Sequence, residues 1–112
     1  MDALLEQLLS TINSDKSIYC LKSVCESLSI DRDYLLATLL LSDDEEMKSV
    51  MNMCLNSIRG HILESFLYGH ISQMRALEYV HTIDSELDIF PLSLKGLASV
   101  VSNCEASIEE YE

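Results

Sequence analysis

The sequence predicts an all-α fold, a compact single-domain bundle or array of about six helices that takes in residues 1–112. Apolar residues recur every three to four positions over almost the whole chain, and no segment of strand length alternates strictly between apolar and polar residues. Three glycines and one proline are too few for the turns of a β-sandwich or barrel. A chain of 112 residues is also long enough for one hydrophobic core and too short for two.

The N-terminal half contains three predicted helices. The first runs from about Asp2 to Ile12, where the apolar residues fall on one helical face. Residues 13–15 end it and supply the N-cap of a second helix that continues to about Leu28. Asp31 caps a third helix. Leucines cover more than half of its circumference, so we expect it to be central.

A long fourth helix is predicted to follow. Ser42 and Glu45 have the spacing of a capping box, and the apolar pattern continues to about Tyr68. Gly60 lies inside this helix and predicts a kink or a close helix crossing. Gly69 is suited to the C-cap.

Two further helices complete the pattern. Ser72 is expected to cap a fifth helix that reaches about Leu87. A sixth begins near Pro91 or Ser93, where the proline breaks the chain, and extends beyond Cys104. The tail from about residue 105 is expected to fray.

The balance of charge is strongly acidic. Nineteen Asp and Glu residues oppose seven Lys and Arg residues, giving a formal net charge of −12. Binding to nucleic acid or to an anionic membrane needs a basic face, so neither is expected. A basic protein partner suits the charge, although solubility and complementation of helix dipoles account for acidic clusters as well.

Three acidic clusters form the candidate partner-binding surface. We expect them to be exposed at helix starts or ends and to form one negative surface that steers a basic partner. Their residues are Asp31, Asp33, Asp43, Asp44, Glu45, Glu46, Asp84, Glu86 and Asp88.

No pattern in the sequence predicts catalysis, a metal site or a cofactor. His61 and Glu64, and likewise Glu78 and His81, are three residues apart, but a helical di-metal site needs further inward-facing Glu residues. We therefore interpret these as surface histidines beside surface acids. The chain lacks a nucleophile elbow and a phosphate-binding glycine loop, so an enzyme is the least favoured class.

The cysteines and the N-terminus predict a cytoplasmic protein. The four cysteines are scattered along the chain and are typical of reduced, core-filling thiols. The first residues are acidic where a secretory signal would be basic. The longest uncharged runs are about half of the length that a membrane span requires.

Residues 21–40 resemble a helix-turn-helix motif. Val24-Cys25 lie within the first helix, and a short turn leads to Leu35 as apolar anchor. Ser29 stands where glycine is usual, and Asp31-Arg32-Asp33 would face DNA phosphates unfavourably. The pattern is equally typical of ordinary helix packing, or of a helix-turn-helix scaffold used for protein contact.

A second resemblance concerns residues 69–78 and 87–91. A glycine turn, then Ile71-Ser72, then a helix containing Ala76 is similar to the small acidic bacterial immunity proteins of the colicin and contact-dependent-inhibition type. The resemblance implies a cytosolic helical protein that binds and blocks one cognate toxin, often a basic nuclease.

The sequence thus favours a small non-catalytic protein that masks a basic partner, either a toxin or a nucleic-acid-handling protein. One alternative is a transcription-associated regulator, or a DNA mimic, built on residues 21–40. The other is a helical homodimer or assembly subunit, because residues 35–41 and Met47, Met51 and Met53 supply much apolar surface.

Overall fold

The computed structural model describes residues 2–88 and 108–109. They form five helices: α1 (Asp2–Ser14), α2 (Leu21–Ser27), α3 (Arg32–Leu41), α4 (Glu45–Leu67) and α5 (Gln73–Asp88). The described ranges contain no strand, so the prediction of an all-α domain is confirmed. The sixth predicted helix lies outside these ranges.

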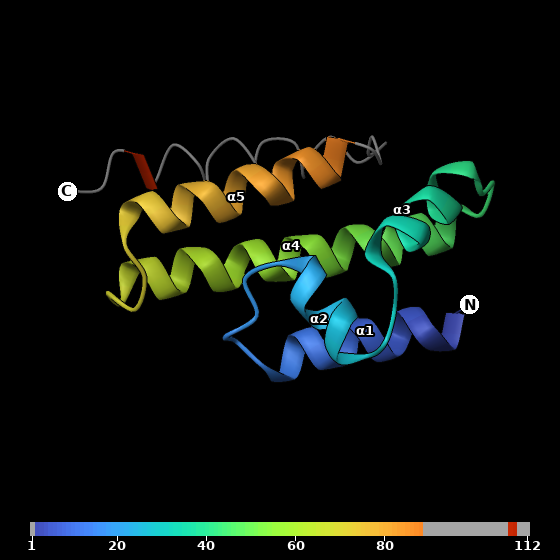
Figure 1. The fold of residues 1–112 in the computed structure, drawn as a ribbon, viewed down its shortest axis with the longest axis horizontal. Coiled ribbons are helices and arrows are strands. Elements are labelled where there is room, and N and C mark those ends of the chain that lie inside the picture. Colours follow the sequence, from blue (N-terminus) through green and yellow to red (C-terminus); the bar gives the residue numbers. More distant parts are fainter. Residues whose placement is uncertain (1, 89–107, 110–112) are drawn as a thin grey trace.

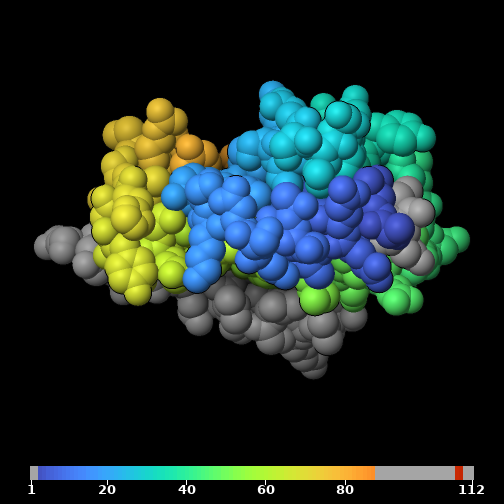
Figure 2. Space-filling view, turned by 90° about the horizontal axis from the view of Figure 1, so that it is seen from below, coloured from blue at the N-terminus to red at the C-terminus, as the bar shows by residue number. Residues whose placement is uncertain are grey.

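Helix α4 is the centre of the arrangement. It packs against α1 on one side and α5 on the other (Figure 1). Helices α4 and α5 are antiparallel, whereas α1 runs in the same direction as α4 because α2 and α3 carry the chain back between them. Figure 2 shows α1 lying across one face of the molecule, with α2 and α3 beside it. The expected central position belongs to α4 and not to α3, because leucines at the end of α3 are exposed.

All five helices contribute side chains to one hydrophobic core. Cys25 and Cys54 belong to it, as the sequence predicts, and burial raises the pKa of their thiols to about 11 and about 12. Cys20 is half-buried, and Cys104 lies outside the described residues. The core includes Leu5, Leu8, Ile12, Leu21, Val24, Leu35, Leu39, Met51, Leu55, Ile58, Ile62, Ala76, Val80 and Ile83.

Helix α2 is shorter than predicted. The Asp15 carboxylate accepts a hydrogen bond from the Ser17 backbone N–H at 3.0 Å, closing a turn that competes with helix. The helix therefore begins only at Leu21, six residues after Asp15. It ends at Ser27, and the turn that follows its C-cap Leu28 contains a left-handed residue, Ser29, with φ of +58°. The position that favours glycine in a helix-turn-helix thus has its characteristic conformation here with serine.

Three of the five predicted caps are correct, and those expected at residues 13–15 and at Ser42 are not. Asp31 accepts from the Tyr34 N–H at 3.1 Å and Ser72 accepts from the Arg75 N–H at 3.2 Å. Gly69 follows α4 with φ of +79°.

The capping box at Ser42 and Glu45 is wrong. Helix α4 begins at Glu45, and its cap is Asp44, which accepts from the N–H groups of Glu46 and Met47. The Ser42 hydroxyl accepts instead from the Asp44 N–H at 3.0 Å. A carboxylate binds these helix N–H groups more strongly than a hydroxyl does, so the start of the helix moves to Asp44.

The expectation of a close helix crossing at Gly60 is corrected. Helix α4 is continuous through Gly60, and a Cβ there would meet nothing within 4 Å, so no other element packs closely at this position. In the tail, Ile108 is fully buried, and its carbonyl accepts from Gln73 of α5 at 3.0 Å. Ile108 is therefore held against α5, whereas the rest of the tail, in which the sequence predicts fraying, lies outside the described residues apart from residue 109.

Candidate partner-binding site

The connection between α3 and α4 combines exposed leucines with exposed acids. Leu40 and Leu41 are 53% and 85% exposed. The next acids along the chain, residues 43–46, are all exposed, and within the described part of the chain none of them forms an ion pair. We call residues 40–46 the α3–α4 corner. It is an apolar projection beside four carboxylates: Asp43, Asp44, Glu45 and Glu46.

The acids at the start of α3 are also exposed. Asp31 caps the helix, and Asp33 accepts from the Nε and Nη2 atoms of Arg32 at 3.1 and 2.7 Å. Since α3 has ten residues, this end lies about 15 Å along the helix from the corner. The structure therefore places the first two acidic clusters at opposite ends of one helix.

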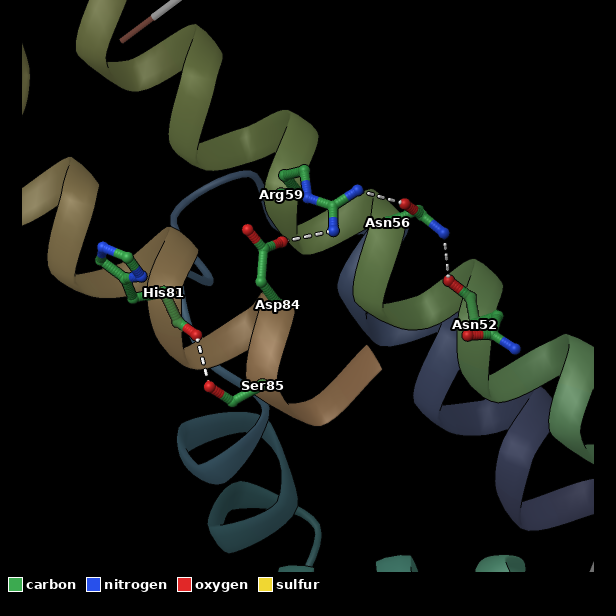
Figure 3. Close-up of polar contacts among 6 residues, drawn as sticks. All are labelled: Asn52, Asn56, Arg59, His81, Asp84 and Ser85. Carbon is green, nitrogen blue, oxygen red and sulfur yellow. Dashed lines mark hydrogen bonds and ion pairs between the residues drawn. The ribbon is translucent and has the colours of Figure 1, made fainter. Parts of the chain in front are cut away.

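Asp84 is not a free surface acid, contrary to the expectation. Its carboxylate accepts from Arg59 Nη2 at 2.6 Å, and the two side chains point towards each other from α5 and α4 (Figure 3). The Arg59 side chain is 2% exposed and that of Asp84 is 18% exposed. The pair lies in the helix interface because each charge compensates the other where water is largely excluded.

Arg59 is an interfacial residue that sequence reasoning missed. Its Nη1 donates to the Asn56 side-chain oxygen at 2.8 Å, and Asn56 in turn donates to the Asn52 carbonyl at 2.9 Å. Residues 52, 56 and 59 are spaced as one helical face, so they form a polar stripe along the central helix. That spacing is the signal that could have identified an internal polar contact.

Glu86 is the second acid whose position contradicts the expected exposure. Its side chain is 5% exposed, and neither carboxylate oxygen has a hydrogen-bond partner among the described residues. Burial raises its pKa to about 7. Nearby Arg32 opposes this rise, and Asp33 adds to it. Asp88, the third acid of this cluster, is the last residue of α5, and its side chain lies outside the described part of the structure.

A groove of about 510 Å³ separates α3 from α5. We call it the α3–α5 groove; it is lined by Arg32, Asp33, Leu36, Ala37, Leu40, Thr82, Ser85 and Glu86. Asp33 and Glu86, which belong to different predicted clusters, thus meet at one concave site. Leu40 connects the groove to the α3–α4 corner, which makes the two features one continuous surface.

A second, smaller pocket of about 250 Å³ lies at the other end of the molecule. It is lined mainly by polar side chains, including Tyr19 and His61. His61 is buried, with Nδ1 3.4 Å from the Ile18 carbonyl, so its interpretation as a surface histidine is wrong. His61 is covered because the connection between α1 and α2, which contains Ile18, passes over α4. His81 is exposed as predicted.

The described residues contain no group of three or more His, Cys, Asp or Glu side chains placed to hold a metal ion. Within the same residues, no helix is both long and apolar enough to cross a membrane. Comparisons with protein-family models, with curated protein sequences and with solved structures find no match to this chain.

Proposed function

We propose that this protein is a non-catalytic binding module that docks a basic protein on the α3–α4 corner. The observation that carries the proposal is the placement of exposed Leu40 and Leu41 beside four exposed carboxylates that form no ion pair within the described chain. Apolar side chains at the centre of a contact supply affinity, and charges around it select the partner and accelerate its approach.

The net charge of −12 supports the same partner chemistry. A long-range negative potential raises the association rate of a basic protein, and salt weakens this effect. Toxin immunity is the concrete form of the proposal, in agreement with the resemblance of residues 69–78 and 87–91 to small acidic immunity proteins. The unpaired thiols of Cys25 and Cys54 agree with a reducing compartment, and we place the complex in the cytoplasm.

The alternatives receive less support from this surface. The left-handed Ser29 gives residues 21–40 a helix-turn-helix type of turn, but exposed Asp31 and Asp33 at the start of α3 would repel DNA phosphates. For self-assembly, part of the expected apolar surface is unavailable. Leu35, Leu39 and Met51 are buried, whereas Leu40, Leu41 and Met53 are exposed. Two corners packed face to face would also bring like charges together.

Affinity capture with matched variants tests the proposal. The tagged chain, Leu41→Ser and the control Leu67→Ser are each used to capture proteins from the lysate of the source organism. Both leucines are exposed, so neither change is expected to disturb folding. We expect a stoichiometric basic protein with the wild type and Leu67→Ser, and its loss with Leu41→Ser.

The captured protein then allows a kinetic test. Asp43→Lys with Glu46→Lys leaves the Asp44 cap intact and should lower the association rate roughly tenfold at low salt. It should also flatten the dependence of that rate on salt. Equal capture by Leu41→Ser, or unchanged kinetics across salt, would contradict docking at the corner.

A further inference from the structure

The residues that line the α3–α5 groove carry several hydrogen-bond acceptors. Glu86 lines it with a side chain whose carboxylate is buried, and the two carboxylate oxygens have no partner among the described residues. Thr82 and Ser85 have already donated their hydroxyl protons, to the Glu78 carbonyl at 3.1 Å and the His81 carbonyl at 2.9 Å. Figure 3 shows the Ser85 hydroxyl directed back to His81. Each hydroxyl oxygen therefore remains an acceptor.

The only cationic residue that lines the groove among those described is Arg32, and its guanidinium is paired with Asp33. Its Nε and Nη2 atoms both donate to one oxygen of Asp33, which offsets its charge and leaves the second Asp33 oxygen as a further acceptor. A ligand that matches these groups must carry several N–H donors and a positive charge. An anionic ligand would meet two carboxylates.

The remaining lining favours an aliphatic chain. Leu36, Ala37 and Leu40 form the apolar wall on α3, opposite Thr82 and Ser85 on α5. An arginine side chain combines a three-methylene stem with five N–H donors in a planar fork, whereas lysine offers three donors at a point. The acceptors of the groove are spread over several residues. The five N–H donors of an arginine fork match this arrangement better than the three donors of a lysine ammonium group.

We propose that the α3–α5 groove binds an arginine side chain of the basic partner, with the Glu86 carboxylate accepting hydrogen bonds from the guanidinium. This inference rests on the proposed function and gives the partner an anchor next to Leu40. A buried carboxylate with no partner is unfavourable in the free protein, and the guanidinium supplies the missing donors.

Binding is expected to depend on pH. Burial holds the pKa of Glu86 at about 7, with Arg32 opposing and Asp33 reinforcing the rise, while the Cys25 thiol nearby stays neutral in this range. A cation favours the ionised carboxylate, so its binding releases a proton when Glu86 starts protonated. Affinity should therefore increase as the pH rises through about 7.

The probe is agmatine, an alkylguanidinium, titrated into the full isotope-labelled chain and followed by backbone amide NMR. We expect saturable shifts at Ala37, Thr82 and Ser85, and no such shifts with (4-aminobutyl)urea, which keeps the ammonium group of agmatine but has a neutral urea in place of its guanidinium. Glu86→Gln should weaken agmatine binding roughly tenfold or more. Ala37→Met, which fills the groove without changing its charge, should do the same.

Glu26→Gln is the control, because Glu26 is exposed on α2 and does not line the groove. Unchanged agmatine affinity in Glu86→Gln, or shifts confined to residues 43–46, would overturn the site. Agmatine binding with no captured partner contradicts only the proposed function. A partner whose affinity is unaffected by Ala37→Met would overturn the assignment to a partner's arginine.

Discussion

Glu86 should make the folded protein less stable as the pH rises. Its carboxyl is buried, and burial raises its pKa from 4.5 to about 7. The folded state therefore holds a proton that the unfolded chain releases, so the destabilisation is absent below about pH 4.5 and complete above about pH 7. At about 1.36 kcal/mol per pKa unit, the full effect is about 3 kcal/mol.

Glu86→Gln isolates this effect because glutamine has the shape of the protonated carboxyl and does not titrate. The measurement is urea unfolding followed by circular dichroism at about pH 5.5 and about pH 8, both clear of the isoelectric point near 4.4. Between these conditions the wild type should lose about 2 kcal/mol more of its free energy of unfolding than Glu86→Gln does.

The matched control is Glu26→Gln, an exposed residue whose variant should keep the pH dependence of the wild type. The comparison between variants cancels the contributions that the other acids make to the pH dependence of stability. One of these acids is Asp15, whose pKa is lowered by hydrogen bonds from Ser17. The reasoning would be refuted if Glu86→Gln and the wild type changed in parallel. Such a result would mean that the carboxylate is compensated in the folded protein.

Two further expectations concern the interior and the helix ends. Asp84→Leu leaves Arg59 buried without its ion-pair partner and should lower the free energy of unfolding by about 3 kcal/mol, while the double variant with Arg59→Leu should recover most of this loss. Equal losses in the single and double variants, measured by urea unfolding, would argue against a coupled pair. Gly69→Ala places a side chain at φ of +79° and should cost about 1 kcal/mol, whereas Gly60→Ala, inside α4 with open space for a Cβ, should add about 0.5–1 kcal/mol. Thermal unfolding measures the stability of the two variants. A change of the same sign in both would contradict the expected difference between a left-handed glycine and a helical one.

The sequence by itself determined the fold class and several helix ends. A period of three to four apolar residues is a local property of the chain, and caps such as Asp31 and Ser72 act over three residues. Competition between neighbouring caps was less predictable. Ser42 and Asp44 are both good N-caps, and the choice depended on the geometry that lets one carboxylate accept two N–H groups.

The acidic surface was predictable only in part. Residues 43–46 are exposed as expected, because they lie in a connection and the first turn of a helix. On α5, however, Asp84 and Glu86 belong to a run of acids at a helix end, and for that reason the sequence predicted them on the surface together with Asp88. Their burial comes from α3 and α4, which are between 17 and 54 residues away in the chain.

Only the tertiary structure therefore decided which acids are available to a partner. The packing of α5 on α4 pairs Asp84 with Arg59, and the approach of α3 to α5 places Glu86 beside a groove without a partner of its own. Composition and periodicity report how many charges the chain carries and which face of a helix is apolar. The environment of a single carboxylate depends on desolvation by residues that are distant in sequence, and that information exists only once the helices have packed.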